Sequence, residues 1–149
     1  EFQLAVKGKP TKDPEISNTF KVNNQDIFLV SDPAHALKAI RNVFVARKLY
    51  MSDKFVEEYC LSTNEITFEW LERMVIFGQQ RELKIFSHLS EKTLRLSGHH
   101  FKKMDVGLAM KVLSYRTSDA IRYLVTNYCE EFPHYYMTTA VFIEKVAET

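Results

Sequence analysis

Residues 26–44 read DIFLVSDPAHALKAIRNVF, and this stretch decides how the chain begins to fold. Its first part holds a continuous run of apolar side chains that are mostly β-branched or aromatic. Such a run is typical of a buried β-strand, so we expect one over residues 26–31. No other part of the sequence indicates a strand as clearly.

The second part of the stretch predicts a helix that follows the strand at once. Asp32 suits the N-cap position, and Pro33 suits the first helical position because it lacks a backbone N–H. Apolar residues then recur at helical spacing from Leu37 to Phe44. We expect this helix to run to about Tyr50, which makes the local unit a strand, a tight turn and a helix.

The sequence on either side of this unit indicates a mainly α-helical body. Residues 1–25 are polar, hold two prolines and end near Asn-Asn, so we expect an extended lead-in that closes with a turn. Residues 62–65 read STNE, which matches a capping box at the start of a helix over 66–78. A last helix is expected from residue 139 onward.

The strongest helical period lies in residues 104–128, where we expect one continuous central helix. Its apolar stripe includes Met110, and Lys111, Ser118 and Arg122 are expected on the opposite, polar side. A helix with this length and pattern is expected to occupy the middle of the core.

The expected fold class is therefore mainly α, with one short strand at 26–31. We expect an extended lead-in over 1–25, a strand–helix segment over 26–50 and a helical domain over 51–149. The last two parts are expected to pack as one globular unit. Residues 79–97 mix leucines with charges, which indicates one or two short helices with an irregular joint.

Composition favours a packed globular domain. The chain has 149 residues, of which 46% are apolar and 26% charged, with a formal net charge of +1. Affinity for nucleic acid must therefore come from local clusters of cations. No run approaches the ~20 apolar residues that a membrane span requires, so we expect an intracellular protein without a membrane partner. Cys60 and Cys129 lack metal-binding spacing and are expected to be reduced and buried.

Asp32 is the sharpest candidate for chemistry, and two interpretations of it remain open. A carboxylate at a strand end can hold a divalent metal, but a two-metal site needs further carboxylates from other elements. The simpler interpretation is that Asp32 only caps the helix. Lys38 and Arg41 are candidates for contacts with DNA phosphates, and Lys102 and Lys103 form a second candidate pair. The alternative for both pairs is an ordinary solvated surface.

Other local patterns add little chemistry of their own. Arg47 and Lys48, with Lys54 nearby, extend the possible basic stripe beyond Arg41. Residues 8–11 read GKPT, but the first glycine of a phosphate-binding loop is missing and no strand precedes them. The sequence therefore excludes a Walker-type nucleotide site.

Four segments of the sequence resemble P-element-like, THAP-type DNA transposases. Residues 31–44, SDPAHALKAIRNVF, resemble the family's DPPH segment. Residues 99–114, HHFKKMDVGLAMKVLS, resemble its H-x-x-F-x-K-M segment, and residues 65–94 and 138–146 are similar to two further family segments. The order and spacing of four segments make this resemblance more specific than any single motif.

The resemblance implies a helical insertion-type domain, with the strand at 26–31 left from an RNase H-like catalytic fold. In that family the insertion binds GTP. Asp32 would take the place of the second catalytic carboxylate, which holds divalent metal such as Mg²⁺ together with residues outside this chain. The sequence is thus expected to be an inactive piece of a longer nuclear protein. It departs from the family where Ala34 replaces a proline and Ala36 a larger apolar residue.

Two functions follow from the resemblance. The first is a transposase module that helps to organise DNA and binds GTP. The second is a domesticated module that binds another nuclear protein within a chromatin or transcription regulator. The second function predicts an apolar groove or patch on the surface of the domain.

Overall fold

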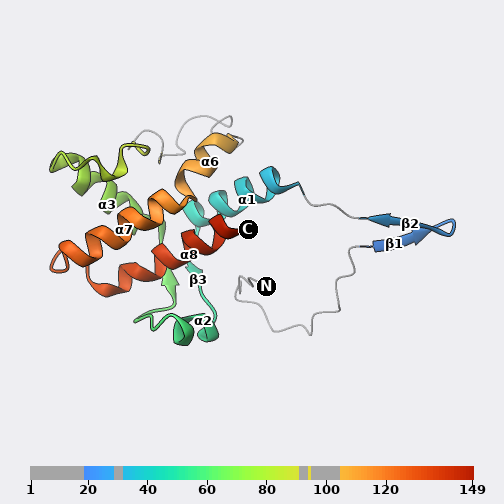
Figure 1. Ribbon diagram of the computed structural model, residues 1–149, viewed down its shortest axis with the longest axis horizontal. Coiled ribbons are helices and arrows are strands. Elements are labelled where there is room, and N and C mark those ends of the chain that lie inside the picture. Colours follow the sequence, from blue (N-terminus) through green and yellow to red (C-terminus); the bar gives the residue numbers. More distant parts are fainter. Residues whose placement is uncertain (1–18, 29–31, 91–93, 95–104) are drawn as a thin grey trace.

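The computed structural model describes residues 19–28, 32–90, 94 and 105–149, and it is mainly helical, as predicted (Figure 1). Two short antiparallel pairs of strands accompany the helices. The α-helices are α1 (Pro33–Ala46), α2 (Asp53–Glu58), α3 (Phe68–Gln80), α6 (Val106–Val112), α7 (Tyr115–Asn127) and α8 (Met137–Glu148). The strands are β1 (Thr19–Val22), β2 (Gln25–Phe28), β3 (Leu49–Tyr50) and β4 (Glu65–Ile66), and 3-10 turns cover Lys84–Phe86 and His134–Tyr136.

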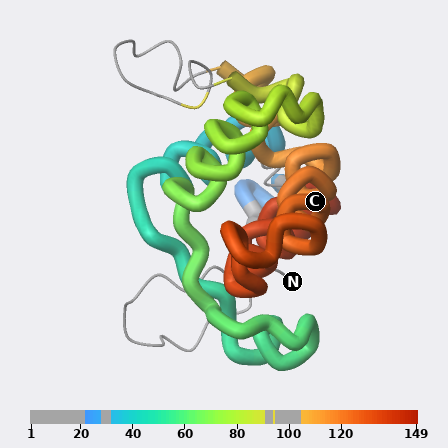
Figure 2. Tube along the Cα trace, turned by 90° about the vertical axis from the view of Figure 1, so that its left-hand side faces the viewer, coloured from blue at the N-terminus to red at the C-terminus, as the bar shows by residue number. Residues whose placement is uncertain are grey.

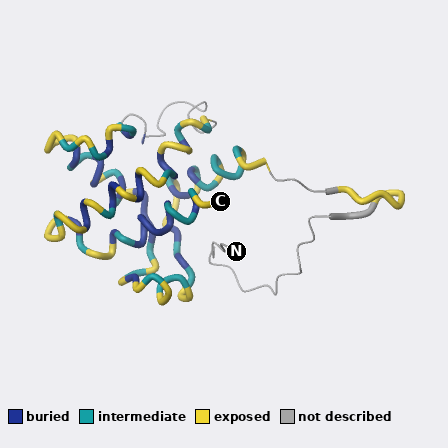
Figure 3. Tube along the Cα trace, in the orientation of Figure 1, coloured by how far each residue is buried: buried dark blue, intermediate teal, exposed yellow. Residues whose placement is uncertain are grey.

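The predicted strand exists in part, but it is not buried. β2 pairs with β1 in a hairpin whose turn residues Asn23 and Asn24 have positive φ angles of 49° and 62°. Asparagine tolerates this left-handed conformation, which matches the twist of a two-residue hairpin. Ile27 is 39% exposed, because the ribbon stands apart from the helical body and no layer covers it (Figure 3). Residues 29–31 of the predicted strand lie outside the described residues.

Helix α1 begins as predicted and ends earlier than predicted. The Asp32 carboxylate accepts a hydrogen bond from the backbone N–H of Ala34 at 2.9 Å, and Pro33 follows in the first turn. The helix ends at Ala46 instead of near Tyr50, because the chain turns extended at Arg47 and continues into β3. A buried leucine in β3 pairs with β4, which helical backbone at that position would prevent.

The helix predicted at 66–78 is α3, but the capping box proposed for residues 62–65 is wrong. Thr63 Oγ1 accepts from the backbone N–H of Glu65 at 3.2 Å, so this segment forms a turn that leads into β4. α3 begins only at Phe68. The expected capping geometry is absent because Glu65 pairs in a strand, where its side chain cannot reach back to a helix start.

The predicted central helix is two helices, α6 and α7. Ser114 interrupts the pattern because its hydroxyl donates to the Lys111 carbonyl at 2.9 Å and accepts from the Thr117 N–H at 3.3 Å, which caps α7. Because the chain changes direction between α6 and α7, two residues have the opposite exposure to the one expected. Met110 is 59% exposed, and Ser118 is buried.

The core lies between α7 and α8, with α1, α3 and α6 packed around them (Figure 2). Figure 2 shows the chain leaving α1 toward α2 and returning to α3, a path that places the end of α1 beside the start of α3. Cys60 and Cys129 are free thiols, but both are exposed rather than buried as expected. Within the described residues, no helix has the length and apolar character of a membrane span.

Candidate functional site

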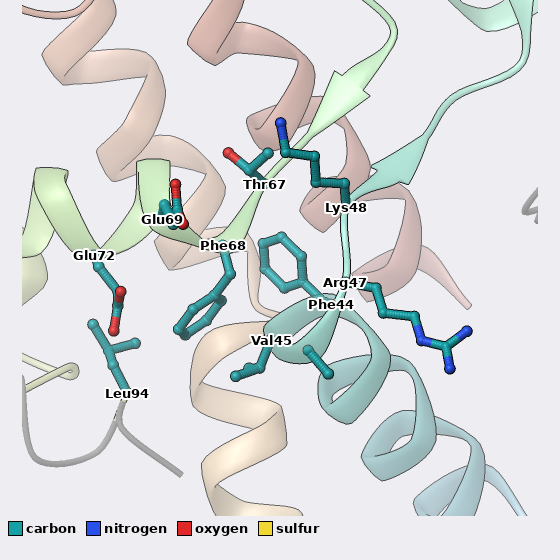
Figure 4. Close-up of a pocket in the computed structure, with 10 residues that line it drawn as sticks. Phe44, Val45, Arg47, Lys48, Thr67, Phe68, Glu69, Glu72 and Leu94 are labelled. Carbon is teal, nitrogen blue, oxygen red and sulfur yellow. The ribbon is translucent and has the colours of Figure 1, made fainter. Parts of the chain in front are cut away.

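A cavity of about 550 Å³ opens between the C-terminal end of α1 and the N-terminal end of α3 (Figure 4). Its volume lies within the ~300–1,000 Å³ typical of small-molecule sites. We call it the α1–α3 pocket. Its principal lining residues are Phe44, Val45, Arg47, Lys48, Thr67, Phe68, Glu69, Glu72 and Leu94.

The short β3–β4 ladder brings the two sides of the pocket together. Leu49 pairs with Ile66 in antiparallel register, so the residues just outside that pair, Lys48 and Thr67, lie at the same end of the ladder. Lys48 Nζ also donates to Glu65 Oε1 at 2.7 Å. That hydrogen bond, with the charge of Glu65, raises the pKa of the Lys48 ammonium, which therefore stays charged at neutral pH.

Two aromatic rings form the floor of the pocket. The rings of Phe44 and Phe68 meet edge to face, with centroids 5.2 Å apart and planes at 87°. Phe142 of α8 packs on the other side of Phe44, with ring centroids also 5.2 Å apart. Because all three residues belong to the buried core, the floor is apolar and rigid.

Thr67 supplies a hydroxyl with no hydrogen-bond partner. It occupies the N-cap position of α3, but its side chain makes no capping hydrogen bond. The residue is only 5% exposed, and Oγ1 bonds to no atom among the described residues. A buried hydroxyl left in this state costs about 1–3 kcal/mol. Figure 4 shows its oxygen on the side of Thr67 that faces Glu69.

Opposite charges line the two sides of the pocket. Arg47 and Lys48 come from the segment after α1, whereas Glu69 and Glu72 come from the start of α3. Figure 4 shows the pairs on opposite sides of the phenylalanine rings, with the Arg47 side chain extending away from them. The pocket thus suits a ligand with a flat apolar body, hydrogen-bond donors at one edge and negative charge at the other.

The residues singled out from the sequence lie elsewhere. Asp32 is exposed at the N-terminal end of α1, and the pocket lies at the other end of that helix. Among the described residues, no group of three or more histidine, cysteine, aspartate or glutamate side chains is arranged to hold a metal ion. Lys102 and Lys103 lie outside the described residues.

The structure places Lys38 and Arg41 on the same helix but in different surroundings. Lys38 is half-buried, whereas Arg41 is 1% exposed and its Nη2 donates to Asn42 Oδ1 at 3.1 Å. Burial lowers the pKa of the Arg41 guanidinium, and the charge of Asp105 opposes that shift. Arg41 is therefore part of the packing inside the domain and does not lie on an open cationic face.

A signal for the burial of Arg41 was present in the sequence. Leu37, Ile40, Arg41 and Phe44 follow the spacing i, i+3, i+4, i+7 of a buried helix face. The pocket residues of α3 carry no comparable local signal. Glu69 and Glu72 look like ordinary acidic residues near the start of a helix, and only the ladder brings Arg47 and Lys48 opposite them.

The fold and the pocket define a small helical domain with a cavity of the size typical of small-molecule sites. A family model described as "TNP-like, GTP-binding insertion domain" matches residues 34–149, which is most of the chain. The chain therefore belongs to the TNP-like, GTP-binding insertion domain family. The predicted resemblance is confirmed at the level of a transposase-like insertion domain.

The comparison with curated proteins and the comparison with solved structures found no match.

Proposed function

We propose that this domain binds a guanine nucleotide in the α1–α3 pocket and helps to organise DNA within a P-element-like, THAP-type transposase or a nuclear protein descended from one. The observation that carries the proposal is the chemistry of the pocket in a domain of a GTP-binding family. One cavity combines an aromatic floor, a buried hydroxyl, two carboxylates and two cations.

The two sides of the pocket match the two ends of a nucleotide. Phosphates carry negative charge, which favours the side formed by Arg47 and Lys48. The base is flat and apolar on its faces, which suits the apolar floor, where the Phe68 ring is 7% exposed beside the fully buried Phe44. Mg²⁺ usually binds nucleotides through phosphate oxygens and retained waters, so it would reach the site on the nucleotide rather than in a protein cage.

Calorimetric titration with GTP and Mg²⁺ tests the proposal. The double variant Arg47→Ala/Lys48→Ala removes the cations, and we expect its affinity to fall by about tenfold to hundredfold, since charged hydrogen bonds contribute roughly 1.5–3 kcal/mol. Lys54→Ala is the matched control, because Lys54 is exposed on α2, outside the pocket lining. Undiminished affinity in the double variant would place the nucleotide elsewhere, and no binding by the unmodified domain would contradict the function itself.

The role in DNA organisation belongs to the parent protein. There we propose that Asp32 contributes to a metal site with carboxylates from outside this chain. Asp32→Asn in the full-length protein separates metal binding from capping, since asparagine caps a helix as well as aspartate does. Loss of Mg²⁺-dependent strand cleavage with unchanged thermal stability is the expected result, and full activity would leave Asp32 as a cap alone.

A second candidate function is supported by an apolar groove. A groove of about 400 Å³ is lined by parts of α1, α6 and α8, and Met110 on its edge is 59% exposed. Such a groove is the feature expected of a domesticated module that binds another nuclear protein. A purified partner that binds the unmodified protein but not Met110→Glu, while GTP binds neither, would favour this function over nucleotide binding.

A further inference from the structure

The first two turns of α3 place two carboxylates at the edge of the α1–α3 pocket, where they could accept hydrogen bonds from the edge of a base. Glu69 and Glu72 are three residues apart, a spacing that puts them on neighbouring positions of one helix face. Both line the α1–α3 pocket next to Phe68, whose ring belongs to its floor. A flat ligand that lies on this floor therefore has its edge within reach of the α3 turn.

Neither carboxylate forms an ion pair in the described part of the chain, although the charge of Glu69 interacts with that of the Lys48 ammonium at longer range. Lys48, the cation nearest to the ladder, already pairs with Glu65. Glu69 and Glu72 form no ion pair or side-chain hydrogen bond with any described residue. Their acceptor oxygens are thus available to a ligand that offers hydrogen-bond donors.

The buried hydroxyl of Thr67 is an independent sign of a missing partner. This side chain is 5% exposed, lines the same pocket and bonds to no described atom. A hydroxyl can donate one hydrogen bond and accept others. A ligand with an acceptor atom next to two donor groups would satisfy all three side chains. Its acceptor would take the hydrogen of the Thr67 hydroxyl, and its donors would bond to the carboxylates of Glu69 and Glu72.

Guanine carries two adjacent donors beside an acceptor, whereas adenine carries only one donor, its 6-amino group, on the same edge. Guanine presents N1–H and the 2-amino group as adjacent donors, with the O6 acceptor beside them. Adenine presents an acceptor, N1, at the position where guanine has a donor. An adenine ring in the same orientation would hold two lone pairs against each other, at N1 and at the carboxylate.

We propose that Glu69 and Glu72 are the specificity-determining residues of the pocket: their carboxylates accept from guanine N1–H and the 2-amino group, while Thr67 donates to O6. This assignment rests on the proposed function, because it requires a nucleotide in this pocket. It goes further in naming the base edge and the residues that select it. The expected order of affinity is GTP, then ITP, then XTP and ATP.

The chemistry of the base edge sets this order. Inosine lacks the 2-amino group and loses one hydrogen bond to a charged acceptor, which weakens binding by about tenfold to hundredfold. Xanthine replaces that donor with an oxygen that faces the carboxylates. Glutamine in place of glutamate removes the charge and supplies an NH₂ donor, so it relieves this clash.

The test is calorimetric titration of the whole chain with Mg²⁺ and each of GTP, ITP, XTP and ATP. We expect Glu69→Gln and Glu72→Gln to bind GTP about tenfold or more weakly than the unmodified chain does. We also expect the difference between the affinities for GTP and for XTP to be smaller in both variants. Glu58→Gln, an exposed position at the end of α2, is the matched control with the same change in charge. Thermal unfolding of each variant shows that it remains folded.

The outcomes separate the two proposals. If the unmodified chain binds no nucleotide, the proposed function fails and this inference fails with it. If the chain prefers GTP and neither glutamine variant changes that preference, the assignment of Glu69 and Glu72 is overturned while nucleotide binding stands. A shift toward XTP in either variant, with no shift in Glu58→Gln, supports the assignment.

Discussion

The Ser118 hydroxyl on α7 donates a hydrogen bond to the backbone carbonyl of Ala140 on α8, with an oxygen–oxygen distance of 2.9 Å. Both residues are buried where the two helices cross. We expect Ser118→Ala to lower the free energy of unfolding by about 1 kcal/mol, the usual net contribution of one hydrogen bond. Urea denaturation measures this change. Thr126→Ala, at an exposed site on the same helix, is the control, and an equal loss there would contradict the role of the Ser118 bond.

Two buried threonines predict opposite effects of the same substitution. Thr138 donates its hydroxyl hydrogen to the Thr63 carbonyl at 2.8 Å, whereas the Thr67 hydroxyl has no partner among the described residues. Thr138→Val should lower the free energy of unfolding by about 1 kcal/mol. Thr67→Val should leave it unchanged or raise it, because the variant no longer buries an unsatisfied hydroxyl. Denaturant midpoints of the two variants test the contrast, and a larger loss at Thr67 would show that its hydroxyl is bonded.

Phe44 is expected to be the most sensitive position beside the pocket. Its ring contacts Phe68 and Phe142 and is fully buried. Phe44→Ala should lower the free energy of unfolding by about 3–5 kcal/mol, which is a large share of the ~5–15 kcal/mol of a typical domain. Val43→Ala, on the exposed side of the same helix, should cost far less. Thermal unfolding compares the two, and similar losses would contradict the packing described here.

His88 predicts a loss of stability in mild acid. Its Nε2 lies 2.8 Å from Thr117 Oγ1, and Thr117 already donates its hydroxyl hydrogen to the Lys111 carbonyl at 2.9 Å. Neutral His88 must therefore donate to Thr117. Burial lowers the pKa of His88 below its usual 6.5, and the nearby charges of Arg116 and Lys111 add to that shift.

The lowered pKa means that the unfolded chain binds the His88 proton more readily than the folded protein does. The stability linked to neutral His88 is thus fully present above pH 6.5 and is lost as the pH falls below it toward the folded-state pKa. His88→Gln removes this titration. Urea unfolding of both proteins between about pH 5 and 8 should show a steeper acid loss in the unmodified chain. Parallel pH profiles would contradict the prediction.

The start of α1 shows what local chemistry makes predictable. Asp32 and Pro33 carry their preference in their own structures, a short acceptor side chain and a fixed φ, so the cap and the first turn follow from the sequence. Ser114 has the same capping chemistry, but strong apolar spacing on both sides concealed it. The break between α6 and α7 was therefore missed although its signal was local.

Where the strands form and which side chains are exposed depends on contacts between residues that are distant in the sequence. Leu49 follows the helical pattern of α1 as well as a strand pattern, and only its pairing with Ile66 selects the strand. Ile27 looks like a buried strand residue because hydrophobicity does not reveal whether a covering layer is present. Both differences reflect tertiary contacts that override local preference.

The sequence by itself determined the mainly helical fold and the family of this domain. Helical periodicity and ordered motifs are patterns among residues that are close together in the sequence, so they can be recognised without the structure. Only the tertiary structure decided the candidate site. One cavity is lined by Arg47 and Lys48 on one side and by Glu69, Glu72 and Thr67 on the other, because a two-residue ladder joins segments that are apart in the chain. The same packing turned Arg41 inward, since the burial of a side chain depends on which helix covers it.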